Sequence, residues 1–128
     1  MNIRLQELRQ LLTELSLLSD VAQSNDEQCA LLDSRDAQPF DDEWVRVHKA
    51  VEHEKRASSL NIQIVDEIRE LAFKKEYQNT GNGEIAGYVS DDFDLLARAI
   101  AVGYSDPWLE LLWNEYHAGR FPHGDLTA

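Results

Sequence analysis

The chain has 128 residues, the usual length of one domain, and its 43% of hydrophobic residues can form a core without a disulfide or structural metal. Its 24 acidic residues outnumber 12 Lys and Arg, which gives a net charge of −12. Such a charge repels phosphate backbones and anionic lipids, and it argues against nucleic-acid and membrane partners. No apolar stretch approaches the roughly 20 residues of a transmembrane helix, and the N-terminus lacks the basic start of a signal peptide. We therefore expect a cytoplasmic protein.

The N-terminal segment predicts two helices. Over residues 3–22, leucines recur at spacings of three and four with charged residues between them, which indicates an amphipathic helix. Ser24 stands three residues before Glu27, the spacing of a capping box, and predicts a short helix through Leu32. Residues 33–39, which end in Pro39, are expected to form a loop.

Residues 41–78 contain neither glycine nor proline and carry a heptad-like stripe of apolar residues. The stripe comprises Trp44, Val47, Val51, Val65, Ile68 and Ala72. A polar stretch over residues 52–59 interrupts it, so either one long helix bends there or two helices meet near Ser58. The unbroken heptad register favours one long or gently broken helix. The stripe fits an intramolecular helix pair and a homodimer seam equally well, and the chain length favours the former.

The glycine-rich segment 79–83 is predicted to break the chain, and the conformation of residues 84–90 stays open between helix and extended chain. Ser90 resembles an N-cap, followed by a helix that is apolar nearly all round and would form the buried centre. Gly103 is placed to end this helix.

The next start signal is Asp106, a capping residue followed by proline, and Gly119 is placed to stop the resulting helix. Residues 91–119 are thus expected to form a C-terminal helical hairpin. The prediction for residues 1–128 is a single all-α domain, a compact bundle of about four to six helices. At its centre we expect one long helix or a helical hairpin.

One carboxylate pattern invites a catalytic interpretation. Glu67 and Glu70 share one helix face, and Asp91 and Asp94 open another helix twenty residues later. On antiparallel neighbouring helices these four carboxylates could hold Mg²⁺ for phosphate chemistry. The pattern resembles that of the all-α nucleoside triphosphate pyrophosphohydrolases of the MazG type, although Asp91 replaces a glutamate. The resemblance implies an Mg²⁺-dependent pyrophosphohydrolase as the alternative function. The simpler interpretation is a charged helix face and a helix N-terminus that favours acids.

A second pattern concerns the distribution of charge and aromatic residues. From Gly81 onward the chain has eight acidic residues but only Arg98 and Arg120 as cations, together with seven of its eleven aromatic residues. Acidic charge mixed with Tyr and Trp is typical of a surface that binds a basic protein. The residues expected to form this surface are Asp91, Asp92, Asp94, Tyr104, Asp106 and Trp113.

The leading functional hypothesis is a non-enzymatic acidic interaction module, such as an inhibitor or immunity-type protein that covers a basic protein surface. Small size, acidity and the lack of a recognisable catalytic motif support it. No histidine lies in a zinc-binding spacing, and we expect no cofactor and no catalytic residue.

Overall fold

The computed structural model describes residues 5–14, 25–54 and 62–126, which form six α-helices and no strand. The all-α prediction is confirmed. The helices are α1 (Leu5–Glu14), α2 (Asn25–Asp36), α3 (Phe40–His53), α4 (Ile62–Thr80), α5 (Gly83–Val102) and α6 (Pro107–His117).

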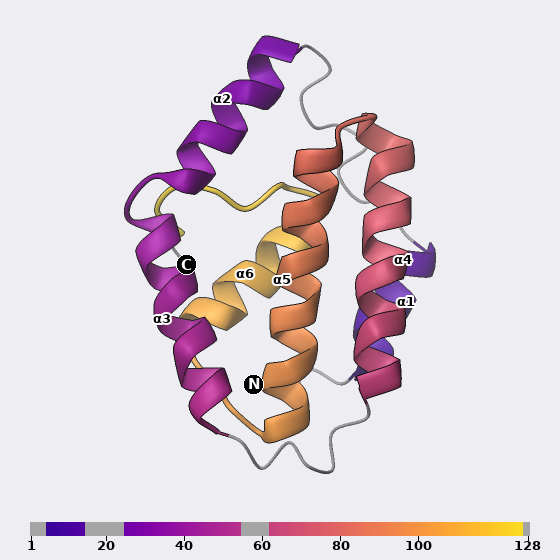
Figure 1. Cartoon of the computed structure of the whole chain (residues 1–128), viewed down its shortest axis with the longest axis vertical. Helices are drawn as coiled ribbons and strands as arrows, with labels where there is room; N and C mark the ends of the chain where they lie inside the picture. Colours follow the sequence, from indigo (N-terminus) through magenta and orange to yellow (C-terminus); the bar gives the residue numbers. More distant parts are fainter. Residues whose placement is uncertain (1–4, 15–24, 55–61, 127–128) are drawn as a thin grey trace.

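The longest helix, α5, lies at the centre of the bundle (Figure 1). Helix α4 runs antiparallel along one side of it, and α3 lies on its other side. Helix α2 continues from α3 towards one end of the molecule, while α6 crosses behind α5. The C-terminal segment returns to α2, where Ser34 Oγ lies 3.0 Å from His123 Nδ1. This arrangement brings the chain's end next to the junction of α2 and α3.

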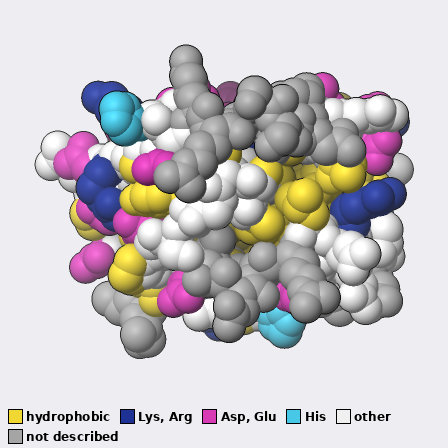
Figure 2. Space-filling view, turned by 90° about the horizontal axis from the view of Figure 1, so that it is seen from below, with side chains coloured by type: hydrophobic (Ala, Val, Ile, Leu, Met, Phe, Trp, Pro, Cys, Tyr) yellow, Lys and Arg dark blue, Asp and Glu magenta, His cyan; other side chains and the backbone are white. Residues whose placement is uncertain are grey.

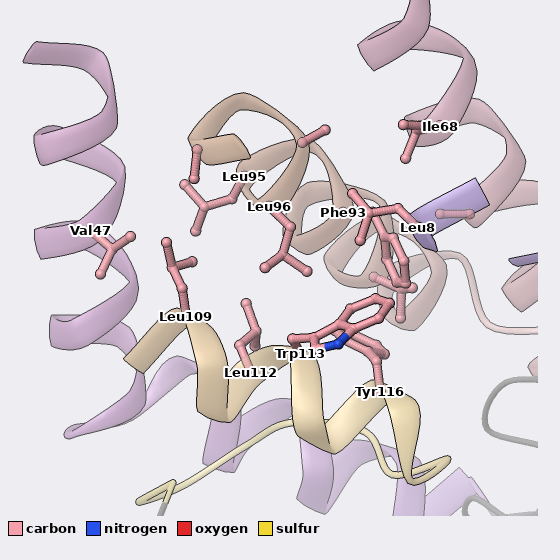
Figure 3. Packing of buried hydrophobic residues seen from close by; sticks show 14 of the residues in the cluster. Leu8, Val47, Ile68, Phe93, Leu95, Leu96, Leu109, Leu112, Trp113 and Tyr116 are labelled. Atoms are coloured by element: carbon pink, nitrogen blue, oxygen red, sulfur yellow. The ribbon is translucent and has the colours of Figure 1, made fainter. Parts of the chain in front are cut away.

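The core collects side chains from five helices around α5 (Figure 3). Phe93, Leu95 and Leu96 of α5 point into the middle of this core. Around them pack Leu8 of α1, Val47 of α3, Ile68 of α4, and Leu109, Leu112, Trp113 and Tyr116 of α6. Half of the residues of α5 are buried, which confirms that its apolar sequence marks the centre of the fold.

The preference for one long helix over residues 41–78 was wrong. Helix α3 ends at His53, where the Glu54 amide donates to the carbonyls of Ala50 and Val51, and α4 begins at Ile62. The two helices lie on opposite sides of α5 (Figure 1). A continuous helix could not place both of its apolar segments against α5, so the chain ends α3 in the polar stretch. Residues 55–61, including Ser58, lie outside the described residues.

The heptad stripe packs mainly in the core of the monomer. Five of its six members are buried and at most 5% exposed, namely Val47, Val51, Val65, Ile68 and Ala72, whereas Trp44 is half-buried. These five therefore pack the monomer's own core rather than offering a free seam to a second copy.

Two expected helix boundaries also differ from the structure. Helix α2 continues to Asp36 instead of ending at Leu32, because Arg35 on its last turn is buried among other helices. Residues 15–24, which include part of the first predicted helix and Ser24, lie outside the described residues.

Helix α5 begins about two turns before Ser90, at Gly83. The Asn82 side chain caps it, accepting hydrogen bonds from the amides of Glu84 and Ile85 at 2.9 and 3.1 Å. Ser90 is therefore inside the helix, where its buried hydroxyl donates to the Arg69 carbonyl of α4 at 3.1 Å. Asn82 is the cap because it follows the glycine turn directly, whereas Ser90 has a continuous helix before it.

The end of α5 and the start of α6 lie where the sequence predicts them. Gly103 adopts a left-handed conformation with φ 74° and ends α5, and Asp106 caps α6 with Pro107 in the first turn. Helices α5 and α6 are thus consecutive, but α6 crosses α5 at an angle, and the antiparallel hairpin with extended packing is α4–α5 (Figure 1). Among the described residues, no helix has the length and apolar character required to cross a bilayer.

Candidate protein-interaction site

A buried ionic cluster connects four helices. The Asp92 carboxylate of α5 accepts hydrogen bonds from the Arg35 guanidinium of α2, the Trp44 indole of α3 at 2.9 Å, and the Tyr116 hydroxyl of α6. Burial and the Asp92 charge raise the pKa of Tyr116 well above its usual value, so its hydroxyl stays a donor. Three donors satisfy one buried carboxylate, as a charge in a protein interior requires.

Arg35 is also enclosed by aromatic rings. Its guanidinium carbon lies 4.5 Å from the ring centre of Phe40, 4.9 Å from that of Tyr88 and 5.3 Å from that of Phe121. These distances are those of cation–π contacts. Phe121 comes from the C-terminal segment, so the arginine fixes this segment and the start of α3 to α2 and α5.

Beside this cluster lies a groove of about 190 Å³ between α2, α3 and α5, here called the acidic groove. Its walls are mainly apolar, and Val45 is 36% exposed there. The residues that line it are Arg35, Asp36, Phe40, Asp41, Trp44, Val45, Tyr88 and Asp91.

Two side chains of the groove are held in place by hydrogen bonds. The Tyr88 hydroxyl donates to the Asp36 carboxylate, and this bond together with burial raises the pKa of Tyr88 to about 12. The Trp44 indole is bonded to Asp92 and stacks on His48 with ring centres 5.1 Å apart. The aromatic walls are therefore positioned before any partner arrives.

The groove carries an excess of negative charge. Among the described residues, neither Asp36 nor Asp41 forms an ion pair, whereas Asp91 pairs with Arg69 at 2.7 Å. Burial raises the pKa of Asp91, while Arg69 lowers it. Because buried Asp92 balances the Arg35 charge and Arg69 balances much of the Asp91 charge, the groove is left with the negative charges of Asp36 and Asp41.

Of the six residues expected to form the binding surface, Asp91 lines the acidic groove, and 41% of its side chain is exposed. Asp92 is fully buried, so its expected role as a surface contact was wrong: its carboxylate balances Arg35 instead. Asp94 is 15% exposed and is paired with Arg98 at 3.1 Å and with Arg69 at 3.6 Å.

The other three expected contacts lie elsewhere. Asp106 accepts from the Trp108 amide at 2.9 Å and from both terminal nitrogens of Arg46 at 2.9 and 3.1 Å, which lowers its pKa. The Tyr104 hydroxyl donates to Asp106 at 3.2 Å. Trp113 is only 9% exposed and belongs to the core. These residues join α6 to the rest of the molecule, and the structure does not gather the six into one surface.

The end of the molecule where α3 and α5 end and α4 begins has mixed character. Figure 2 shows a group of hydrophobic side chains there, with Lys or Arg side chains on both sides and acidic side chains scattered around them. The negative charge of the C-terminal half is therefore not concentrated on this face.

The alternative metal site does not form. Helices α4 and α5 are antiparallel neighbours as that hypothesis required, but Arg69 lies between their carboxylates and pairs with Asp91 and Asp94. Glu70 pairs with Lys74 at 2.8 Å and Glu67 faces Arg9 at 3.9 Å. No group of three His, Cys, Asp or Glu side chains among the described residues could hold a metal ion. The pyrophosphohydrolase interpretation is not supported.

Sequence reasoning missed the contribution of α2 and α3 to the site. Asp36 fell in an expected loop, and Asp41 was only the first residue of the helical segment expected over residues 41–78. Trp44 was assigned to the heptad stripe, and Tyr88 fell in the segment left open. The available signal was the run from Asp36 to Trp44, which contains four carboxylates and two large aromatic residues within nine positions.

Comparison with known proteins agrees with a binding function. The profile of the family "Immunity protein PIM1" matches residues 7–123, which is most of the chain. No curated protein matches the chain significantly. The prediction of an immunity-type protein is confirmed by the family match, and with it the binding of a partner protein. The chain belongs to the immunity protein PIM1 family.

Proposed function

We propose that this immunity protein neutralises a toxin by covering a basic patch of the toxin with the acidic groove. The net charge of −12 attracts a basic partner and repels other acidic proteins. The proposal places this encounter in the cytoplasm, as the composition predicts.

The observation that carries the proposal is the combination of three carboxylates with apolar walls in one groove. Trp44, Val45 and Tyr88 offer anchoring area, and Asp36 and Asp41 offer charge that no cation among the described residues neutralises. Interfaces take most of their binding energy from such partly enclosed aromatic positions, while charges at the rim govern the association rate. A groove of about 190 Å³ lies below the usual range of small-molecule sites, about 300–1,000 Å³, and favours a protein side chain as its occupant.

Site-specific photo-crosslinking tests the proposal. A benzophenone amino acid replaces Val45 in the groove, and in a matched control it replaces Gln63, an exposed residue of α4. Extracts of the cells that encode the protein are irradiated, and the crosslinked protein is identified by mass spectrometry. That protein is then expressed alone and together with the wild-type chain. The expected partner is a basic protein that stops growth alone and is neutralised by co-expression.

A charge-reversal variant completes the test. Asp41→Lys should reduce neutralisation and slow association, and the loss should grow as the ionic strength falls. Asp66→Lys on α4 introduces the same charge at an exposed site outside the groove and serves as its control. Crosslinking of the toxin from Gln63 but not from Val45, or equal effects of the two lysines, would contradict the groove as the contact surface.

A further inference from the structure

Resting on the proposed function, we propose that the acidic groove receives one arginine side chain of the toxin. The occupant is thus a guanidinium group, rather than an ammonium group or an apolar anchor.

The dimensions and walls of the groove suit a single flat cation. Its volume of about 190 Å³ corresponds to roughly six water molecules at liquid density, enough for one extended side chain. Trp44 and Tyr88 line it, and both rings are already fixed through hydrogen bonds to Asp92 and Asp36. Fixed aromatic rings lose little entropy when a guanidinium stacks against them.

The molecule already uses this chemistry next to the groove. The Arg35 guanidinium contacts the rings of Phe40 and Tyr88 and is paired with the carboxylate of Asp92. The groove repeats the same combination on its open side, with aromatic walls and with Asp36 and Asp41 in place of the buried carboxylate. An arriving arginine would therefore find the type of environment that this fold already provides for one arginine.

The charges of the groove favour an incoming cation. Arg35 beneath the groove does not repel it strongly, because the ion pair with Asp92 cancels most of the Arg35 charge. Among the described residues, Asp36 and Asp41 form no ion pair, so the incoming guanidinium would not have to displace another cation from them. A planar guanidinium binds a carboxylate through two parallel hydrogen bonds and is more weakly hydrated than an ammonium. Arginine should therefore bind better than lysine of the same charge.

The test is a titration of the ¹⁵N-labelled protein with two capped peptides, acetyl-Gly-Arg-Gly-amide and acetyl-Gly-Lys-Gly-amide. The indole N–H signal of Trp44, identified with Trp44→Phe, reports on the groove directly. We expect this signal to move with the arginine peptide at a Kd at least about threefold lower than with the lysine peptide. The double variant Asp36→Asn/Asp41→Asn should raise the arginine Kd at least about threefold, whereas Asp66→Asn should leave it unchanged.

The outcomes separate the inference from the proposed function. No movement of the Trp44 indole up to about 50 mM peptide, or equal Kd values for arginine and lysine, would overturn the arginine site. The toxin could still be captured and neutralised in that case, so the proposed function would stand. An arginine preference at the groove combined with unchanged neutralisation by Asp41→Lys would keep the arginine site and contradict the proposed function.

Discussion

Arg35 and Asp92 form an ion pair that is closed to solvent at both ends, with 3% and 0% of their side chains exposed. The pair joins the last turn of α2 to the middle of α5, and Trp44 and Tyr116 add donors from α3 and α6. Two charges removed from water are stable only while both are present, because either one alone would be an uncompensated charge in a medium of low dielectric constant.

Asp92→Asn should therefore destabilise the protein by about 3–5 kcal/mol, although it preserves the size of the side chain. Urea unfolding followed by tryptophan fluorescence measures the change. Asp91→Asn is the matched control, since it makes the same chemical change one residue away in a side chain that is 41% exposed. Its cost should stay below about 1 kcal/mol. Similar values for the two variants would show that the buried pair contributes little.

The helix boundaries predicted well are those set by local chemistry. Gly103 ends α5 and Asp106 with Pro107 begins α6 because capping and left-handed backbone depend on neighbouring residues alone. Ser90 has the same local features as a cap, but Asn82 lies upstream and starts the helix first. Local signals of equal strength cannot be ranked without knowing which segment packs against α4.

The site was predicted less well because its chemistry depends on tertiary neighbours. Asp91 and Asp92 are identical side chains at adjacent positions, yet one faces the groove and the other is buried against Arg35. Their different environments depend on the rotation of α5 about its axis and on the position of α2. The partner of Asp92 on α2 is Arg35, which is 57 residues away in the chain. The acidic and aromatic character of a binding surface could be anticipated, whereas its assembly from α2, α3 and α5 could not.

Gly87 inside α5 and Gly103 at the C-cap of α5 should respond in opposite ways to substitution by alanine. Gly103 has φ 74°, so Gly103→Ala should cost about 1 kcal/mol through left-handed strain. Gly87 lies within α5, and a Cβ added there meets nothing within 4 Å. Gly87→Ala should stabilise the protein by about 0.5–1 kcal/mol, because alanine loses less backbone entropy in a helix. Thermal unfolding compares them, and a stabilising Gly103→Ala would contradict the assigned backbone.

Asp106 should prove a structural residue rather than a contact residue. Asp106→Ala removes the cap of α6 and the bidentate pair with Arg46, and should cost about 1–2 kcal/mol in chemical denaturation. Asp106→Asn keeps the capping oxygen and should recover about half of this loss. Asp125→Ala, a change at an exposed residue near Asp106, should alter stability by less than about 0.5 kcal/mol. A full loss with asparagine would assign the effect to the ion pair alone.

Glu76 makes stability depend on pH. Its carboxyl is fully buried in α4, and burial raises its pKa to about 8, although Asn79 and Lys75 lower it. The folded protein therefore holds a proton that the unfolded chain, in which a glutamate has its ordinary pKa of 4.5, releases. The stabilisation that this proton adds to the folded state is complete below pH 4.5, and it declines as the pH rises to about 8.

Glu76→Gln keeps the shape of the protonated side chain and removes its titration. Between pH 5 and pH 8 the free energy of unfolding of the wild type should fall relative to that of this variant, by about 1.4 kcal/mol per pH unit at most. The difference should level off above the pKa of about 8. Urea unfolding at several pH values measures it, with Glu67→Gln, an exposed change on the same helix, as the control. A constant difference between wild type and Glu76→Gln across this range would mean that Glu76 is ionised in the folded state, held by a charge or donor that compensates its burial.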